Sequence, residues 1–189
     1  MRTRFSQAPT SWAASTAGAL AAAALLTWGP TPAQAQVQLS GRSLPLALAT
    51  EAAQEALRSC ETSGYRVSVS VVDTSGLERV LLRGDASTVH TRETAFKKAY
   101  TIVTLGPIFG QTSTGALTER ISKTPTGPAL ATVSQVILLA GGVALRAGDE
   151  TLAALGVGGA PGGALDEQCA QAGAAKVQQR LDALRAVRP

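Results

Sequence analysis

The sequence predicts an α+β domain with a central, largely antiparallel sheet of about five strands and flanking helices. Residues 66–83 and 136–157 are rich in β-branched residues and are broken by short turns, which is typical of neighbouring strands that run antiparallel. Residues 46–62 and 89–106 instead repeat their apolar positions at helical spacing, and a third helix is predicted over 165–184.

The first 35 residues have the composition of a secretory signal peptide. Arg2 and Arg4 form a positive start, the apolar run 13–26 follows, and Ala33-Gln34-Ala35 is typical of a cleavage site. That run has about 14 residues, fewer than the roughly 20 that a helix needs to span a bilayer. We therefore expect Sec-type export with cleavage after Ala35 and a periplasmic or secreted protein, with an uncleaved anchor as the alternative.

Removal of 35 residues from 189 leaves 154, in which 36–44 is a lead-in and 45–189 has the size of one domain. Loss of Arg2 and Arg4 lowers the formal net charge from +4 to +2. The chain has no basic patch interleaved with aromatic residues, so no nucleic-acid partner is expected.

The chain has two cysteines, Cys60 and Cys169. An exported protein meets an oxidising compartment, which favours a disulfide between them; two buried thiols that never meet are the alternative. A bridge closes a loop of about 110 residues, for which chain entropy stabilises the fold by roughly 4–5 kcal/mol at most. The sequence has no C-x-x-C pair or Cys/His cluster, which argues against a structural zinc site.

The first elements are a helix and a hairpin. Helix 46–62 follows Pro45, which a first helical turn tolerates, and Gly64 ends it. Valines that alternate with serines from Val67 to Val71 predict a strand, and 77–83 returns as the second strand. Asp73-Thr74-Ser75-Gly76 lies between the two strands and has the chemistry of a turn.

The helix predicted over 89–106 contains His90, the single histidine of the chain, and Gly106-Pro107 is expected to end it. A helical wheel separates an apolar side from a polar side. The apolar side, expected to face the core, has Ala95, Phe96, Ala99, Ile102 and Val103. The polar side has His90, Thr94, Lys97 and Thr101.

A short helix over 114–121 and a breaker-rich connection over 122–128 come next. The apolar run 136–139 predicts a strand buried on both faces, which 143–146 continues across a bulge at Gly141-Gly142.

Residues 151–157 return as another strand, and the glycine-rich loop 156–163 leads to the last helix. Such a loop either cradles an anion or makes a tight turn with close strand-to-helix packing, and its spacing fits no nucleotide-binding motif. Asp166 and Glu167 are interpreted as acids favoured at a helix start.

Short segments in a fixed order across 46–184 resemble a known family. They are Val69-Ser70-Val71-Val72-Asp73 with Gly76, residues 95–101, 141–146 and 155–160, and Asp166-Glu167 with Cys169-Ala170. This ordered set resembles the GlcG/HbpS family of small haem-binding domains, which is related to the C-terminal domain of PduO-type proteins. The resemblance implies homo-oligomers and b-type haem in some members. The chain departs from the family at Ala144, where proline is frequent, and at Gly159, where serine is frequent.

Haem iron is usually held by His, Cys, Met or Tyr. Met1 leaves with the signal peptide and the cysteines are expected to be paired, so His90, Tyr65 and Tyr100 remain. Imidazole suits iron best, and we expect His90 to be the axial ligand, with Tyr100 a weaker candidate at the edge of the core. A solvated histidine at a helix start is the alternative.

Arg92, Lys97 and Lys98 are the candidates for pairing with haem propionates, although surface ion pairs orient a ligand more than they contribute affinity. Thr94 and Thr101 are candidates for hydrogen bonds to the ligand or to a neighbouring subunit. The alternative for the three basic residues is an ordinary solvated helix face.

The sequence shows no catalytic constellation around its single histidine, because Asp85 and Ser87 lie in no recognisable nucleophile context. We therefore expect a haem-binding protein more than an enzyme, one that captures, buffers or presents haem to a membrane sensor or transporter. The first alternative is an enzyme or enzyme accessory acting on a small organic molecule, with haem as a redox centre. The second is a structural module whose site has been lost.

Overall fold

The computed structural model describes residues 43–184, and the predicted signal peptide and most of the lead-in lie outside them. Within the described range the helices and strands are, in chain order, α1 (Leu46–Thr62), β1 (Ser68–Asp73), β2 (Glu78–Arg83), α2 (Thr91–Phe109), α3 (Thr114–Ser122), α4 (Gly127–Leu130), β3 (Gly142–Ala147), β4 (Glu150–Gly158) and α5 (Gly163–Ala183). In this part of the chain, no helix is long and apolar enough to cross a membrane.

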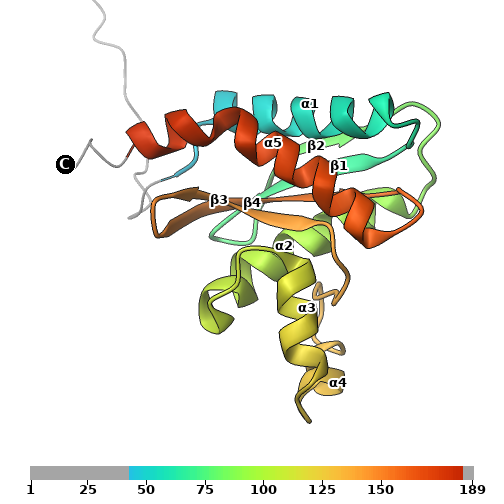
Figure 1. Cartoon of the computed structure of the whole chain (residues 1–189), viewed down its shortest axis with the longest axis vertical. Coiled ribbons are helices and arrows are strands. Elements are labelled where there is room, and N and C mark those ends of the chain that lie inside the picture. The colour runs from blue at the N-terminus through green and yellow to red at the C-terminus, as the bar shows by residue number, and fades with distance from the viewer. Residues whose placement is uncertain (1–42, 185–189) are drawn as a thin grey trace, which may run out of the picture. The chain divides into compact units, whose positions relative to one another are not determined.

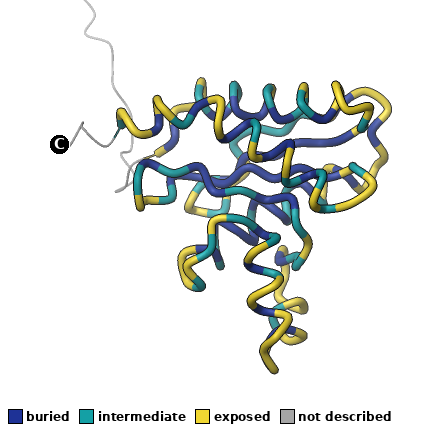
Figure 2. The backbone as a smooth tube through the Cα atoms, in the orientation of Figure 1, coloured by how far each residue is buried: buried dark blue, intermediate teal, exposed yellow. Residues whose placement is uncertain are grey.

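The four strands form one antiparallel sheet in the order β2-β1-β4-β3. Helices α1 and α5 lie on one face of the sheet, α2 lies on the other, and α3 and α4 extend away from that second face (Figure 1). Strands β1, β3 and β4 are mostly buried and β2 is half-buried, whereas α3 and α4 alternate between buried and exposed residues (Figure 2). The predicted α+β fold is confirmed, with four strands where about five were expected.

The prediction of a strand over 136–139 is wrong. This segment is irregular, with Val136 buried and Leu139 51% exposed, and β3 begins only at Gly142. The backbone N–H of Ile137 donates a hydrogen bond to the Thr101 hydroxyl of α2 at 2.8 Å. The run is apolar because it covers α2, and the irregular register of β3 lies further on, between residues 145 and 146.

Helix α2 is longer than predicted, because it continues through Pro107 to Phe109. A proline so close to the end of a helix removes only the hydrogen bond that its missing N–H would have made to Val103. Gly110, at φ 64°, then ends the helix in the left-handed conformation.

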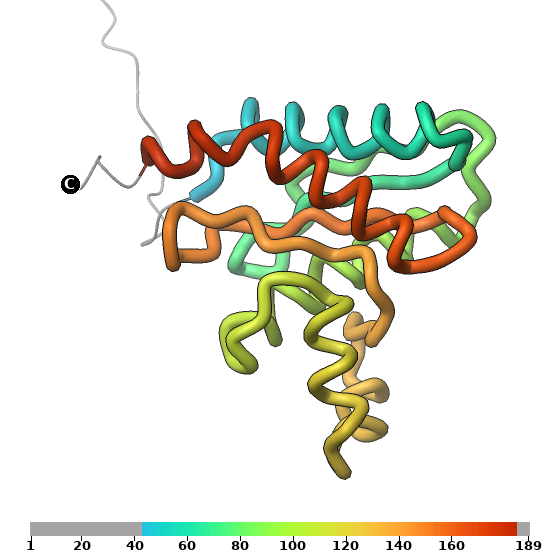
Figure 3. The backbone as a smooth tube through the Cα atoms, in the orientation of Figure 1, coloured from blue at the N-terminus to red at the C-terminus, as the bar shows by residue number. Residues whose placement is uncertain are grey.

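The larger apolar cluster lies between the sheet and the pair α1 and α5, which run side by side (Figure 3). Helix α1 buries only alanines and one cysteine there, and Gly173 of α5 has room for no side chain, since a Cβ would lie 2.4 Å from the Ala52 carbonyl oxygen. The predicted disulfide is confirmed: Cys60 and Cys169 join the end of α1 to the start of α5, with their Cα atoms 5.5 Å apart.

Candidate functional site

Helix α2 rests directly on the sheet because glycines replace side chains beneath it. A Cβ on Gly156 would lie 2.1 Å from the Ala95 carbonyl oxygen, and one on Gly142 would lie 2.4 Å from the Lys98 carbonyl oxygen. Both distances are far below van der Waals contact, so any larger residue would push α2 away. This favours the packing interpretation of the glycine-rich stretch after β4.

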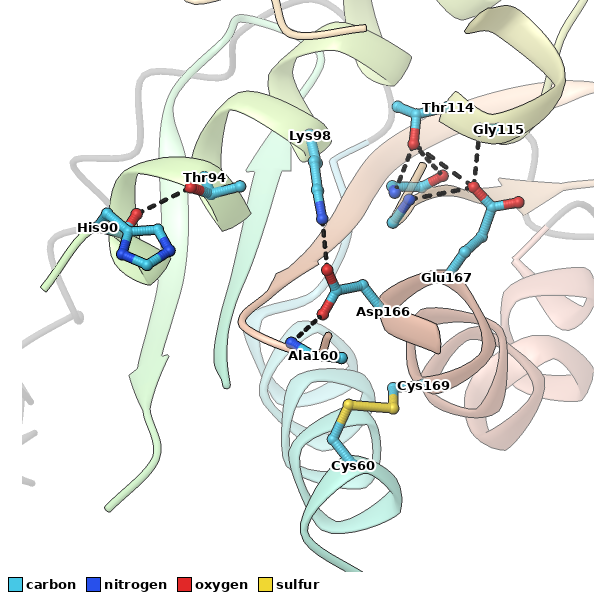
Figure 4. A network of polar contacts seen from close by, with 12 residues as sticks. Cys60, His90, Thr94, Lys98, Thr114, Gly115, Ala160, Asp166, Glu167 and Cys169 are labelled. Atoms are coloured by element: carbon cyan, nitrogen blue, oxygen red, sulfur yellow. Dashed lines mark hydrogen bonds and ion pairs between the residues drawn. A yellow bond between two sulfur atoms is a disulfide. The ribbon is translucent and has the colours of Figure 1, made fainter. Parts of the chain in front are cut away.

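Lys98 and Asp166 form a buried ion pair that joins α2 to α5 (Figure 4). The Lys98 ammonium donates to Asp166 Oδ2 at 2.6 Å, and each side chain is 3% exposed. Asp166 Oδ1 accepts the Ala160 N–H at 2.9 Å, so the anion that the glycine-rich loop holds is the protein's own carboxylate. The expectation that Lys98 pairs with propionates is wrong, because its charge is buried and already matched.

Two opposing effects act on the Asp166 carboxyl. Burial is the larger, and it raises the pKa of Asp166. The hydrogen bond and positive charge of Lys98, followed by the backbone N–H groups of Ala160 and Gly159, lower this pKa but do not cancel the effect of burial. Burial therefore disfavours the charged carboxylate, and loss of either partner would leave the other charge buried and unmatched.

Glu167, the next residue, connects α5 to two further segments. Its Oε2 accepts the backbone N–H of Gly115 at 2.8 Å and that of Gly141 at 3.1 Å (Figure 4). The positions of Asp166 and Glu167 in the sequence predict only a helix start. Their contacts with Lys98, Gly115 and Gly141 have no local signal, because these partners lie 26 to 68 residues away along the chain.

His90 is the residue that immediately precedes α2. It is exposed, as predicted, and its Nδ1 lies 3.3 Å from the Thr88 hydroxyl. The Thr94 hydroxyl donates to the His90 carbonyl oxygen at 2.9 Å, which fixes the first turn of the helix (Figure 4).

A hollow of about 450 Å³ lies at the start of α2, and His90 itself is not among the residues that line it. Its lining combines apolar and charged groups: Glu78, Val89, Arg92, Glu93, Phe96 and Gln135. Lys97 neutralises Glu93 at 2.7 Å, and Glu78 accepts the Ser70 hydroxyl at 2.8 Å. The carboxylates of the hollow are thus engaged with the protein, whereas Arg92 is exposed.

Two residues of α2 that were predicted to contact the ligand, Thr101 and Tyr100, do not lie near His90. Thr101 is fully buried and its hydroxyl accepts the Ile137 N–H, so the prediction that it shares the exposed side with His90 is wrong. Tyr100 packs at the edge of the smaller core, as expected, with its ring 5.8 Å from that of Phe96. At about 1.5 Å of rise per residue, Tyr100 lies roughly 15 Å along the helix from His90, too far to share one metal ion.

A second hollow, of about 530 Å³, lies at the other end of α2. Its lining includes Gln111, Thr112, Arg146 and Thr151. Arg146 there faces Asp149 at 3.5 Å. Within the described residues, no group of three or more histidine, cysteine or acidic side chains is placed to hold a bare metal ion.

The arrangement of these elements is shared with known proteins. A family model described as haem-degrading protein HbpS-like matches residues 44–175. The chain belongs to the HbpS-like family. His90, the Lys98–Asp166 pair and both cysteines all lie within the matched residues.

Solved structures support this assignment. The chain is 39% identical to HbpS, over 72% of its own length and 92% of that chain, with a TM-score of 0.65. It is 37% identical to a double mutant of HbpS from Streptomyces reticuli, over 78% and 95% of the two chains, with a TM-score of 0.65. It is 25% identical to PduOC in a complex with haem, over 71% and 95%, with a TM-score of 0.63. Among curated proteins, no match is found.

Proposed function

We propose that this HbpS-like protein binds haem at the start of α2, with His90 as the axial ligand. The observation that carries the proposal is the exposed side chain of His90 at the start of α2, next in sequence to Val89, which lines the 450 Å³ hollow. Histidine is one of the usual ligands of haem iron. The contact of His90 Nδ1 with the Thr88 hydroxyl holds the imidazole ring. The family assignment and the haem complex of PduOC support the choice of ligand.

The residues of the hollow fit a b-type haem. Val89, 86% exposed, and Phe96 offer apolar surface for a porphyrin face. Arg92 is exposed and offers a guanidinium to a propionate. Lys97, five residues further along α2, is paired with Glu93. Thr94 holds the helix start through the His90 carbonyl. Tyr100 and Thr101 are left out of the proposed site, because both side chains belong to the packed side of α2.

The cellular role proposed is capture, buffering or presentation of haem outside the cytoplasm. The disulfide between Cys60 and Cys169 supports an oxidising compartment, in agreement with the signal peptide predicted from the sequence. A homo-oligomer and a membrane sensor or transporter as the receiving partner belong to the same proposal.

The experiment is a hemin titration of the purified protein, followed by the Soret band. We expect a shift for the wild type and a loss of most of that shift in His90→Ala. Arg92→Ala is expected to weaken binding without removing the band shift, and Arg120→Ala, an exposed arginine of α3, is the matched control. An identical Soret band in His90→Ala would exclude His90 as the ligand.

A second candidate function is favoured by the description of the family, which names haem degradation. In this alternative the protein is an enzyme or enzyme accessory with bound haem as its redox centre. The bound haem would supply the redox chemistry, while His90 would hold the iron and Arg92 would orient the propionates. Incubation of the haem-loaded protein with peroxide or a reductant separates the candidates: decay of the Soret band with release of iron supports degradation, and a stable band supports binding alone.

A further inference from the structure

Two links hold the helix pair α1 and α5 together, one at each end. Cys60 and Cys169 join the end of α1 to the start of α5, and Glu51 accepts from Arg180 at 2.6 Å near the opposite end. The disulfide is buried, since Cys60 is 0% and Cys169 is 4% exposed, whereas the Arg180 side chain is 49% exposed. The same helix pair therefore has a covalent interior link and a solvated ionic one.

The disulfide end of α5 also holds the buried polar contacts. Asp166 lies one helical turn before Cys169, with its carboxylate on Lys98 of α2 and on the Ala160 N–H (Figure 4). Glu167 lies between Asp166 and Cys169 and accepts the N–H groups of Gly115 and Gly141. A single turn of α5 thus connects α1, α2, the start of α3 and the segment before β3.

The start of α5 has no side-chain cap of its own. Gly162 is the N-cap residue of α5 and makes no side-chain cap, and Gly163 follows it. Glycines have more conformational freedom to lose on folding than other residues, so the start of the helix is ordered at an entropic cost. The disulfide offsets that cost by tying Cys169 to α1, and the Lys98–Asp166 pair offsets it by tying the preceding turn to α2.

We infer that the Cys60–Cys169 disulfide and the buried Lys98–Asp166 pair form one redox-sensitive latch on the first turns of α5. Opening either half frees this turn and releases its hold on α2. Reduction by a dithiol breaks the S–S bond and leaves two cysteine thiols, while the dithiol is oxidised to its own disulfide. Because both sulfur atoms are buried, the dithiol reaches them when this turn opens, and the reduction rate measures that opening.

The coupling must be reciprocal, which gives a test from both sides. From the first side, dithiothreitol reduces the folded protein and the rate of thiol appearance is recorded. Asp166→Asn, which keeps an oxygen for the Ala160 N–H but loses the negative charge that faces Lys98, is expected to speed reduction by about tenfold or more. Arg180→Gln, which breaks the link at the other end of the same helix pair, is expected to leave the rate within about twofold.

A third variant separates local opening from general loss of stability. Leu117→Ala removes a fully buried side chain from α3, in the smaller core on the far face of the sheet. We expect it to lower global stability without speeding reduction as Asp166→Asn does. Equal acceleration in Leu117→Ala and Asp166→Asn would overturn the inference, and so would an unchanged rate in Asp166→Asn.

From the second side, hydrogen exchange compares the oxidised and reduced wild type, so this arm does not depend on whether a variant folds. Peptides covering 137–142, 159–168 and the part of α2 around Lys98 are expected to exchange about tenfold faster after reduction, and the last turns of α5 to change little. Exchange that rises evenly over the chain, or only next to the two cysteines, would contradict a shared latch. Neither arm requires haem, so the result is independent of the proposed function.

Discussion

The two faces of the sheet bury different kinds of side chain. Under α1 and α5, β1 contributes Val69 and Val71 to the larger apolar cluster. Under α2, the same strand contributes Ser68 and Ser70, both fully buried, and only Val72 joins the smaller cluster. The first face is closed and apolar, whereas the second is polar at one end.

The polar end of the second face leads to the proposed site. The Ser68 hydroxyl lies 2.8 Å from that of Thr91 in the first turn of α2, and Ser70 donates to Glu78, which lines the hollow at the start of α2. Buried hydroxyl groups are tolerated there because each has a partner. The α1 and α5 face is therefore packed with apolar side chains, whereas the α2 face combines a smaller apolar cluster with buried polar groups held by specific partners.

The largest effect is expected where α2 meets the sheet. Gly156→Val places a side chain where even a Cβ would lie 2.1 Å from the Ala95 carbonyl oxygen, so α2 can no longer dock. We expect a loss of at least about 4 kcal/mol in the free energy of unfolding, measured by denaturant titration. Gly162→Ala is the matched control, since its Cβ would meet no atom within 4 Å. Similar losses in both variants would show that the close approach of α2 is unimportant.

The ion pair that links the two faces comes next. Lys98→Met leaves Asp166 buried without its cation, and we expect a loss of about 3–5 kcal/mol near pH 7. Lys98→Met combined with Asp166→Asn is expected to lose less, because it leaves no unmatched charge. Denaturant titrations of the three proteins measure both values. A double variant less stable than Lys98→Met would show that the unmatched carboxylate is not the cause of the loss.

The disulfide of the apolar face is expected to have a somewhat smaller effect. Replacement of Cys60 and Cys169 by alanine removes a link across 109 residues, for which about 2–4 kcal/mol of stability is typical. Thermal unfolding of the oxidised wild type and the double variant measures the difference. An unchanged midpoint would indicate that the packing of α1 against α5 suffices without the covalent link.

A pH dependence separates burial from pairing at Asp166. Burial raises the pKa of Asp166 above its ordinary value of 3.8, so the folded protein binds this proton more tightly than the unfolded chain. The stability contributed by the proton is present below 3.8 and is lost as the pH rises through the raised pKa. The stability of the wild type relative to Asp166→Asn should therefore fall as the pH is raised from 3.8. A difference that grows with pH would show that Lys98 outweighs burial.

The smallest effect on stability is expected at His90, on the polar end of the second face. His90→Ala removes an exposed side chain, so the free energy of unfolding should change by less than about 0.5 kcal/mol. Thermal unfolding without haem measures this value, and a large loss of stability would assign His90 a structural role. The contrast with Lys98, eight residues further on, tests whether function and stability are separated along α2.

Local patterns determined much of this protein before its structure was known. The spacing of alanines predicted α1 over its actual range, the alternation of valine and serine predicted β1, and the chemistry of Asp73 predicted its turn, where its carboxylate accepts the N–H groups of Ser75 and Leu77. These features depend on neighbours within a few residues, which the sequence displays directly. The exposure of His90 follows in the same way from its position at the start of α2.

Only the tertiary structure decided which polar residues are free. Thr101 and Lys98 have no local signal for burial, and their partners Ile137 and Asp166 come from distant segments. The run 136–139 likewise has the composition of a strand, yet it covers α2, because a buried apolar segment has the same composition whether it pairs in a sheet or crosses a helix. Burial of a side chain depends on how the helices pack against the sheet, whereas helices and turns are determined largely by residues that are close in the sequence.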